Sequence, residues 1–144
     1  MTGNIEEILG YHFSNKELLI QALTTRAYSN EHLCKDQNEF RTVGDVVIKL
    51  ALTEMLMGSG KRSGGTITPA RIKLEKKKGL SNAARKLKIE PFLRLGKGQI
   101  IQNHGNSDHV LAETLEAIAG AIFLDAGFDK PKDAIRKWFI DEGI

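Results

Sequence analysis

The sequence predicts an all-α fold, and two observations support that prediction. Apolar residues recur at helical spacing, most clearly at Phe40, Val43, Val47 and Leu50, as in a helix with one buried face. No stretch of useful length alternates apolar and polar residues as a half-buried strand would. The 144 residues suit one domain with a sizeable core. We therefore expect residues 1–144 to form a single domain without repeats.

Capping residues place the first two predicted helices. Ser14 followed by Glu17 is a capping box, and it predicts a helix that runs through about Thr25. Asp36 can cap a second, long helix that stops at Gly58.

The next two helices are predicted from proline and glycine. Thr68 stands before Pro69, which suits the first turn of a helix, and Gly79 can close that helix. Ser81 can cap a short helix that ends before Pro91.

The last third of the chain reads as a loop followed by two helices. Residues 95–107 are polar and rich in glycine, so a loop is expected there. Residues 111–128 form a long apolar helix in this interpretation. Asp129 opens a last helix that runs through Trp138 to about Glu142.

Composition is that of a soluble globular protein, with 41% hydrophobic and 27% charged residues. The single cysteine, Cys34, excludes an internal disulfide framework and fits a reducing compartment. No apolar run is long enough to span a bilayer or to act as a secretory segment. We expect a cytoplasmic protein that uses neither a membrane nor a small-molecule cofactor.

Positive charge is concentrated in one segment, although the net charge is only +3. Residues 71–97 hold ten basic residues against two acidic ones, Glu75 and Glu90. Such a stripe indicates an anionic partner such as nucleic acid, while the alternative is a set of solvated helix faces. Few aromatic residues lie among these lysines, so contact with the backbone of a duplex is favoured over base stacking.

Two carboxylates in residues 111–128 are candidate metal ligands. Glu113 and Glu116 are three residues apart and therefore neighbours on one side of a helix. Their surroundings in the sequence are apolar, and a carboxylate beside a buried surface needs a partner. Hard divalent cations take oxygen ligands. The alternative is that both glutamates simply face water.

A third carboxylate, Asp45, follows a glycine inside the long helix. Glycine costs a helix about 1 kcal/mol relative to alanine, so Gly44 implies close packing against another helix. If that neighbour carries Glu113 and Glu116, and also Gly120, three carboxylates converge and require a cation.

Mg²⁺ or Mn²⁺ would relieve the repulsion between these carboxylates and activate water for phosphodiester hydrolysis. The alternative is that Asp45 pairs with Lys49 or Arg41, one helical turn away.

Four segments in order resemble the catalytic domain of ribonuclease III. They are LGYHFSNKELLIQALTTRAYSNE, NEFRTVGDVVIKLAL, FLRLGKG and LAETLEAIAGAIFLDAGF, and the likeness covers roughly residues 5–139. The resemblance implies an all-α homodimer that cleaves double-stranded RNA with magnesium and leaves short 3′ overhangs. The chain resembles this domain alone, with no appended double-stranded-RNA-binding domain.

The resemblance also assigns site residues. Asp45 matches the aspartate of the signature's GD pair, Glu116 matches the glutamate that closes the later acidic pair, and Glu113 stands where aspartate is usual. These three are the predicted metal ligands, and Asp45 and Glu116 the predicted catalytic residues. The predicted RNA-binding residues come from the basic stripe: Lys73, Lys76, Lys77, Lys78, Arg85 and Lys97.

The chain departs from the family pattern at four further places. Arg41 stands where the signature has a metal-binding glutamate, and Asn38 takes the preceding acidic position. Thr42 replaces the phenylalanine that plugs into the partner subunit. Residues 66–70 lack another glutamate found in many relatives.

The resulting hypothesis is a metal-dependent endoribonuclease that acts on double-stranded or structured RNA in RNA processing. The alternative is a catalytically silent domain that binds structured RNA or a protein partner.

Overall fold

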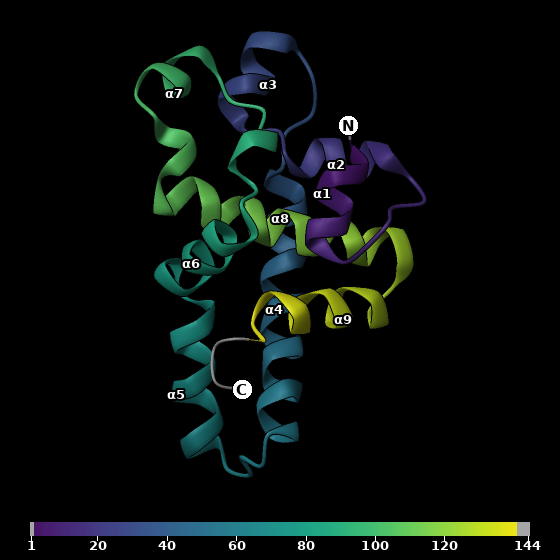
Figure 1. Cartoon of the computed structure of the whole chain (residues 1–144), viewed down its shortest axis with the longest axis vertical. Helices are drawn as coiled ribbons and strands as arrows, with labels where there is room; N and C mark the ends of the chain where they lie inside the picture. The colour runs from purple at the N-terminus through teal and green to yellow at the C-terminus, as the bar shows by residue number, and fades with distance from the viewer. Residues whose placement is uncertain (1, 141–144) are drawn as a thin grey trace.

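The computed structural model describes residues 2–140 and is built from helices (Figure 1). Within this part of the chain there is no strand, only one isolated bridge between Thr24 and Arg94. The α-helices are α1 (Thr2–Leu9), α2 (Lys16–Ala22), α3 (Arg26–His32), α4 (Asn38–Gly58), α5 (Gly64–Glu75), α6 (Lys77–Leu87), α7 (Lys97–Ile101), α8 (Asp108–Ala126) and α9 (Asp129–Trp138). Two short 3-10 helices, η1 (Glu90–Phe92) and η2 (His104–Asn106), flank α7. The predicted all-α fold is confirmed.

Helices α4 and α8 cross at the centre of the molecule, and the other helices pack around them (Figure 1). Leu115, Ile118 and Ile122 of α8 are fully buried, and so are Ala51 and Leu52 of α4. Burying a side chain of the size of leucine or isoleucine contributes about 1.5–3 kcal/mol. This crossing therefore contributes to stability and also forms the frame of the site.

Helix α8 is well defined at both ends. The Ser107 side chain accepts a hydrogen bond from the Val110 N–H at 3.1 Å, as an N-cap does. Gly127 follows the last turn with a φ of +83°, a conformation that favours glycine. The helix therefore starts three residues earlier than the sequence predicted, at Asp108, and ends at Ala126.

The predicted boundaries around the basic stripe were wrong. Helix α5 starts at Gly64 and contains Pro69 in its second turn, so Thr68 does not cap it. The missing N–H of this proline costs only the bond to the carbonyl of residue 65, near the helix start. Gly79 lies inside α6, where an added Cβ would stand 2.3 Å from the Leu74 carbonyl oxygen. Glycine serves there for close packing, not for ending a helix.

Ser81 was also assigned a wrong role. It is fully buried within α6, and its hydroxyl donates to the Lys78 carbonyl at 3.1 Å. The break between α5 and α6 falls at Lys76, whose backbone is extended.

The amino-terminal part of the structure holds more helix than predicted. Helix α1 was not foreseen, and the helix expected from residue 14 to about 25 is the shorter α2, capped by Asn15 instead of Ser14. Thr25 starts the separate helix α3 by accepting from the Tyr28 N–H.

The carboxy-terminal predictions were partly wrong. The loop predicted over residues 95–107 contains α7 and η2. The last predicted helix ends at Trp138, before its expected end at Glu142, which lies outside the described residues. In the described part of the chain, no helix is both long and apolar enough to cross a membrane.

Candidate metal and nucleic-acid site

The crossing of α4 and α8 is a direct contact between two backbones. A Cβ at Gly44 would lie 1.6 Å from the Glu116 carbonyl oxygen, and one at Gly120 would lie 2.0 Å from the Phe40 carbonyl oxygen. Both positions therefore require glycine. The prediction that Gly44 and Gly120 let the two helices approach is confirmed, and the contact sets Asp45 beside Glu116.

Glu116 carries the clearest electrostatic signature of the site. Burial raises the pKa of this carboxyl to about 7, and the neighbouring Asp45 carboxylate adds to the rise. Arg41 works in the opposite direction but does not cancel these effects. Among residues 2–140, no ion pair neutralises Glu116 directly. A carboxyl with a pKa near neutrality beside other carboxylates is a feature of functional sites.

Glu113 is held by two basic side chains. Arg41 Nη2 lies 2.7 Å from Glu113 Oε2, and His109 Nε2 lies 3.2 Å from the same oxygen. Arg41 also donates through Nη1 to Asn38 Oδ1 at 3.2 Å. The two atypical signature residues therefore contact each other. Arg41 does not pair with Asp45, because it reaches across to α8 instead.

Asp45 pairs with Lys49, one helical turn further along α4. The distance from Lys49 Nζ to Asp45 Oδ2 is 3.2 Å, and both side chains are about half exposed. This is one of the two pairings that the sequence left open as an alternative to metal binding. An exposed pair of this kind is weak, worth about 0.3–0.5 kcal/mol, so a cation competes with it easily.

Sequence reasoning missed a fourth carboxylate, Glu75 at the end of α5. Its side chain is only 13% exposed, and its Oε2 lies 3.2 Å from Arg71 Nε without a hydrogen bond. Burial raises the pKa of Glu75, while Arg71 and Lys49 lower it and Asp45 raises it further. The available signal was its place as one of two acidic residues in the basic stripe.

A pocket of about 260 Å³ joins these groups. Its walls include three carboxylates, those of Glu75, Glu113 and Glu116, together with Arg41 and Lys77. Acidic side chains from two helices, α5 and α8, thus meet at one cavity together with two basic side chains. Such an arrangement suits a ligand that is itself part cation and part anion, such as a metal ion with a phosphate group.

The donor set fits a hard divalent cation. Carboxylate oxygens are the ligands that Mg²⁺ and Mn²⁺ prefer, and the buried Glu75 Oε2 lacks a hydrogen bond. Within residues 2–140, however, no three acidic, histidine or cysteine side chains are placed so that they would hold an ion without moving. Lys49 and Arg41 each engage one of the predicted ligands. Joint ligation by Asp45, Glu113 and Glu116 stays a prediction.

Most of the predicted RNA-binding lysines lie together. Lys73, Lys76, Lys77 and Lys78 surround the junction of α5 and α6, and all four are exposed. Lys77 also lines the acidic pocket. Positive charge therefore borders the carboxylates on this side, as contact with a charged backbone requires.

The other two predicted RNA-binding residues are placed differently. Arg85 forms an ion pair with Asp108 at 2.6 Å and donates to the Asn106 carbonyl at 2.7 Å, so it also fastens α6 to the start of α8. Lys97 opens α7, where its N–H donates to Glu31 of α3. Figure 1 shows α7 beside α3, away from α5.

Fold and site define a class: all-α domains in which the crossing of two buried helices carries an acidic cluster. The sequence places the chain more narrowly, since residues 15–142 match the Ribonuclease-III-like family model. The chain belongs to this family.

Similar proteins agree with that assignment. Ribonuclease 3 of Cupriavidus taiwanensis is 42% identical over 137 residues, which are 94% of this chain and 52% of that protein. Ribonuclease 3 of Bordetella avium is 35% identical over 139 residues, 96% of this chain and 54% of that protein. The chain thus spans about half the length of these relatives.

A solved structure shows the same fold. The nuclease domain of ribonuclease III from Campylobacter jejuni superimposes with a TM-score of 0.87 at 27% identity. The match covers 96% of this chain and 92% of that one. A second structure of that domain, described in terms of flexibility in the region involved in dimer formation, gives a TM-score of 0.84 at 29% identity.

Proposed function

We propose that this domain is a metal-dependent endoribonuclease that cleaves double-stranded or structured RNA. The observation that carries the proposal is the acidic cluster at the glycine-mediated crossing of α4 and α8, with exposed lysines at its edge. Membership of the ribonuclease-III-like family supports it.

Asp45, Glu113 and Glu116 would hold Mg²⁺ or Mn²⁺, with Glu75 within reach of the same pocket. Such an ion activates water and neutralises charge on the phosphate, an effect worth several kcal/mol. Without a cation, burial and the neighbouring Asp45 carboxylate raise the pKa of Glu116 to about 7, so this carboxyl is partly protonated at neutral pH. Lys73, Lys76, Lys77 and Lys78 would bind the RNA backbone beside the cluster.

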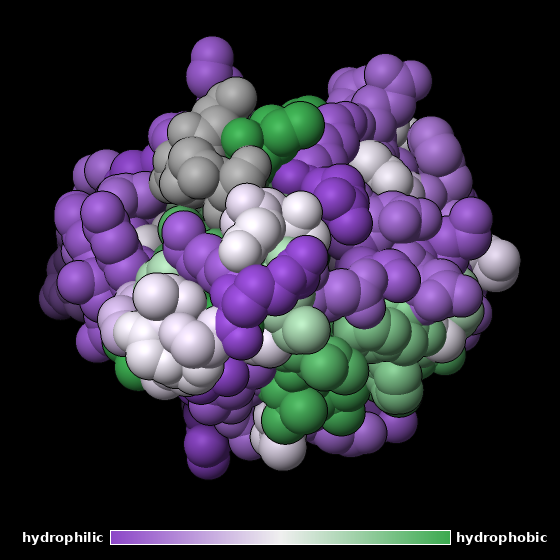
Figure 2. Space-filling view, turned by 90° about the horizontal axis from the view of Figure 1, so that it is seen from below, coloured by the Kyte–Doolittle hydropathy of each residue, from purple (hydrophilic) through white to green (hydrophobic). Residues whose placement is uncertain are grey.

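We further propose that the domain works as a homodimer through α4. Val46, Leu50 and Met57 are exposed large apolar residues spaced along one side of this helix, and the exposed Thr42 precedes them at the same helical spacing. Figure 2, a view of the end where α4 and α5 meet, shows apolar surface gathered in one area of a largely hydrophilic face. Apolar patches of this kind mark interaction sites.

The activity test uses long double-stranded RNA with Mg²⁺ or Mn²⁺. We expect the wild-type protein to cut it and Glu116→Gln to be slower by about a hundredfold or more, since a metal ligand contributes several kcal/mol. Glu17→Gln is the matched control, because Glu17 is exposed on α2, away from the cluster. It should cut normally.

Two results would count against the enzyme. Cleavage that survives Glu116→Gln would remove the proposed site. No cleavage by the wild-type protein, together with binding of structured RNA, would point to a catalytically silent domain. Arg41→Glu gaining activity in that case would identify the residue responsible.

A further inference from the structure

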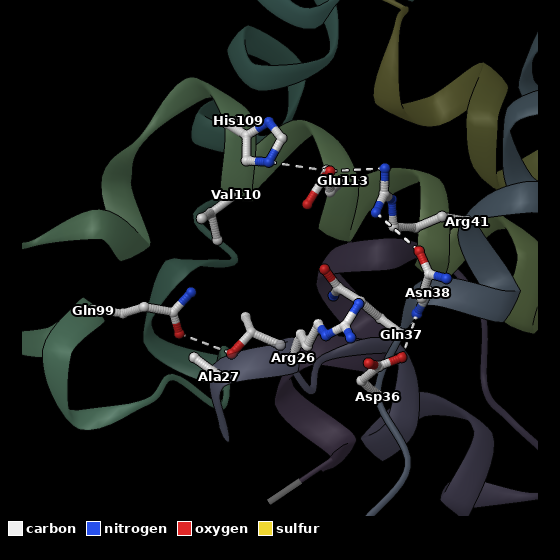
Figure 3. A pocket seen from close by; sticks show the side chains of 11 residues that line it. Arg26, Ala27, Asp36, Gln37, Asn38, Arg41, Gln99, His109, Val110 and Glu113 are labelled. Atoms are coloured by element: carbon white, nitrogen blue, oxygen red, sulfur yellow. Dashed lines mark hydrogen bonds and ion pairs between the residues drawn. The ribbon is translucent and has the colours of Figure 1, made fainter. Parts of the chain in front are cut away.

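Arg41 lies in the wall between two pockets. The smaller one is the acidic pocket that Glu75, Glu113 and Glu116 line. The larger, of about 330 Å³, lies between α3, α4 and α8 (Figure 3). Arg41, Glu113 and His109 line both, so the contacts of Glu113 with Arg41 and His109 form the partition. Any movement of Arg41 therefore changes both cavities.

The bonding of Arg41 is incomplete. Its two terminal nitrogens are used by Glu113 and Asn38, but its Nε is buried and has no hydrogen-bond partner. A guanidinium group offers five N–H donors in a fixed plane. Phosphate matches this geometry better than a single carboxylate oxygen does, because it accepts two parallel hydrogen bonds.

The larger pocket contains a second arginine whose side chain can bind an anion. The side chain of Arg26, the first residue of α3, is exposed and makes no hydrogen bond or ion pair within residues 2–140. Figure 3 shows its side chain among the residues that line the pocket. Gln99 uses its Oε1 to accept from Thr25 and Gly96, which leaves its amide N–H groups as donors.

The charges of the larger pocket are balanced in the free protein. Two arginines, Arg26 and Arg41, face two carboxylates, Asp36 and Glu113. Asp36 is turned toward the backbone, where it accepts from the Asn38 N–H at 2.9 Å. If Glu113 moves to a metal ion in the smaller pocket, the larger pocket is left with excess positive charge. Metal binding on one side then favours phosphate binding on the other.

We propose that Arg41 is an exchangeable counter-ion. It holds Glu113 in the free protein, and it transfers to a backbone phosphate of the RNA in the larger pocket, which releases Glu113 to the metal ion. This inference rests on the proposed nuclease function and adds its regulation. It explains how a chain with arginine at a metal-ligand position keeps a usable site, and it makes metal and RNA binding mutually dependent. Coupling of this kind is reciprocal.

The test measures the affinity for Mn²⁺ by electron paramagnetic resonance, with and without a short RNA duplex. The samples are kept cold, and a gel shows that the RNA duplex has not been cleaved during the measurement. In the wild-type protein the duplex should raise the Mn²⁺ affinity about tenfold, within the usual range of coupling between sites. Arg41→Ala should bind Mn²⁺ without RNA as tightly as the wild type does with RNA, and the duplex should add nothing. Arg41→Gln should behave in the same way.

Two other arginines provide controls. Arg26→Ala should weaken RNA binding and leave the RNA-free Mn²⁺ affinity unchanged, because Arg26 does not contact Glu113. Arg136 is exposed on α9, so Arg136→Ala should change neither. Arg26→Ala should also reduce the increase in Mn²⁺ affinity that the duplex causes. This variant can therefore test the proposal even if neither Arg41 variant folds.

The outcomes separate this inference from the proposed function. Equal Mn²⁺ affinity with and without RNA, in a wild-type protein that cleaves RNA, overturns the exchange but leaves the nuclease standing. The exchange is also overturned if wild type and Arg41→Ala bind Mn²⁺ equally tightly without RNA. Absence of Mn²⁺ binding in both proteins, together with absence of cleavage, overturns the nuclease proposal itself.

Discussion

Two groups of carboxylates in this molecule have opposite environments. Near the amino terminus, Glu6 is 1% exposed, but it accepts from the Phe13 N–H and from Lys16. Burial alone would raise the pKa of Glu6, yet these partners outweigh it and lower the pKa. At the crossing of α4 and α8, burial raises the pKa of Glu116, and the opposing effect of Arg41 does not cancel the rise.

Asp125 resembles Glu6 rather than Glu116. Burial would raise its pKa, but the hydroxyl of Tyr11 and the N–H groups of Ser14 and Asn15 hold it below the ordinary range. These bonds tie the loop after α1 to the end of α8. A carboxylate whose oxygens are satisfied inside the chain serves the fold, and one left unsatisfied beside its neighbours is available for a ligand.

The largest expected effect comes from adding a Cβ atom at the crossing, where there is no room for one. Gly44→Ala places a Cβ against the Glu116 carbonyl and should lower the free energy of unfolding by about 3 kcal/mol or more. Gly58→Ala is the control, because no atom lies within 4 Å of its Cβ. It should be neutral or slightly stabilising. Urea unfolding measures both, and equal stability would contradict the backbone contact.

The second prediction sets the two groups of carboxylates against each other. Glu6→Gln should lower the free energy of unfolding by about 2 kcal/mol, since it removes hydrogen bonds to a charged group. Glu116→Gln should leave stability unchanged or raise it, because it removes repulsion with Asp45. Urea unfolding compares the two variants. If both variants lose the same stability, Glu6 and Glu116 do not differ in this way.

The third prediction concerns pH in the metal-free protein. The folded-state pKa of Glu116, about 7, lies above its ordinary value of 4.5. The stability that this group contributes is therefore complete below pH 4.5 and is lost as pH rises to about 7. The Tm of wild type minus that of Glu116→Gln should fall across this window. A constant difference would contradict the raised pKa.

The smallest effect separates two lysines. Lys77→Ala should leave stability unchanged and reduce the slope of log affinity for RNA against log salt by about one, because Lys77 borders the acidic pocket. Lys16→Ala should do the reverse, since Lys16 neutralises Glu6 at 2.7 Å. Binding titrations at several salt concentrations, together with thermal unfolding, measure both. If both variants change stability and salt dependence in the same way, Lys77 has a structural role.

The sequence predicted the parts of the site that depend on local spacing. Glu113 and Glu116 follow from helical geometry, and Gly44 with Gly120 follows from the cost of glycine inside a helix. These patterns were sufficient for the all-α fold and for the α4–α8 crossing. Joint metal binding by the three carboxylates is a prediction that the structure leaves for experiment.

Other features depend on tertiary contacts that the sequence does not encode locally. Glu75 reaches the pocket only because α5 folds back along α4, and the sequence around it is rich in lysine. Gly79 and Ser81 looked like helix-ending and helix-starting residues, but Gly79 lies against the carbonyls of α5 and Ser81 is buried inside α6. The partner of Arg41 was also unpredictable, because pairing within one helix and pairing across to α8 fit the same sequence.

The contact at Gly44 and Gly120 also fixes the distance between α4 and α8. Backbone atoms, which are the same in every sequence, make this contact and set the separation of the two helices. Exchanges among the surrounding side chains therefore leave the helix separation unaltered. If the proposed site binds metal ions of different radius, the acidic side chains themselves have to adjust, and a glutamate at position 113 reaches one methylene further than an aspartate would.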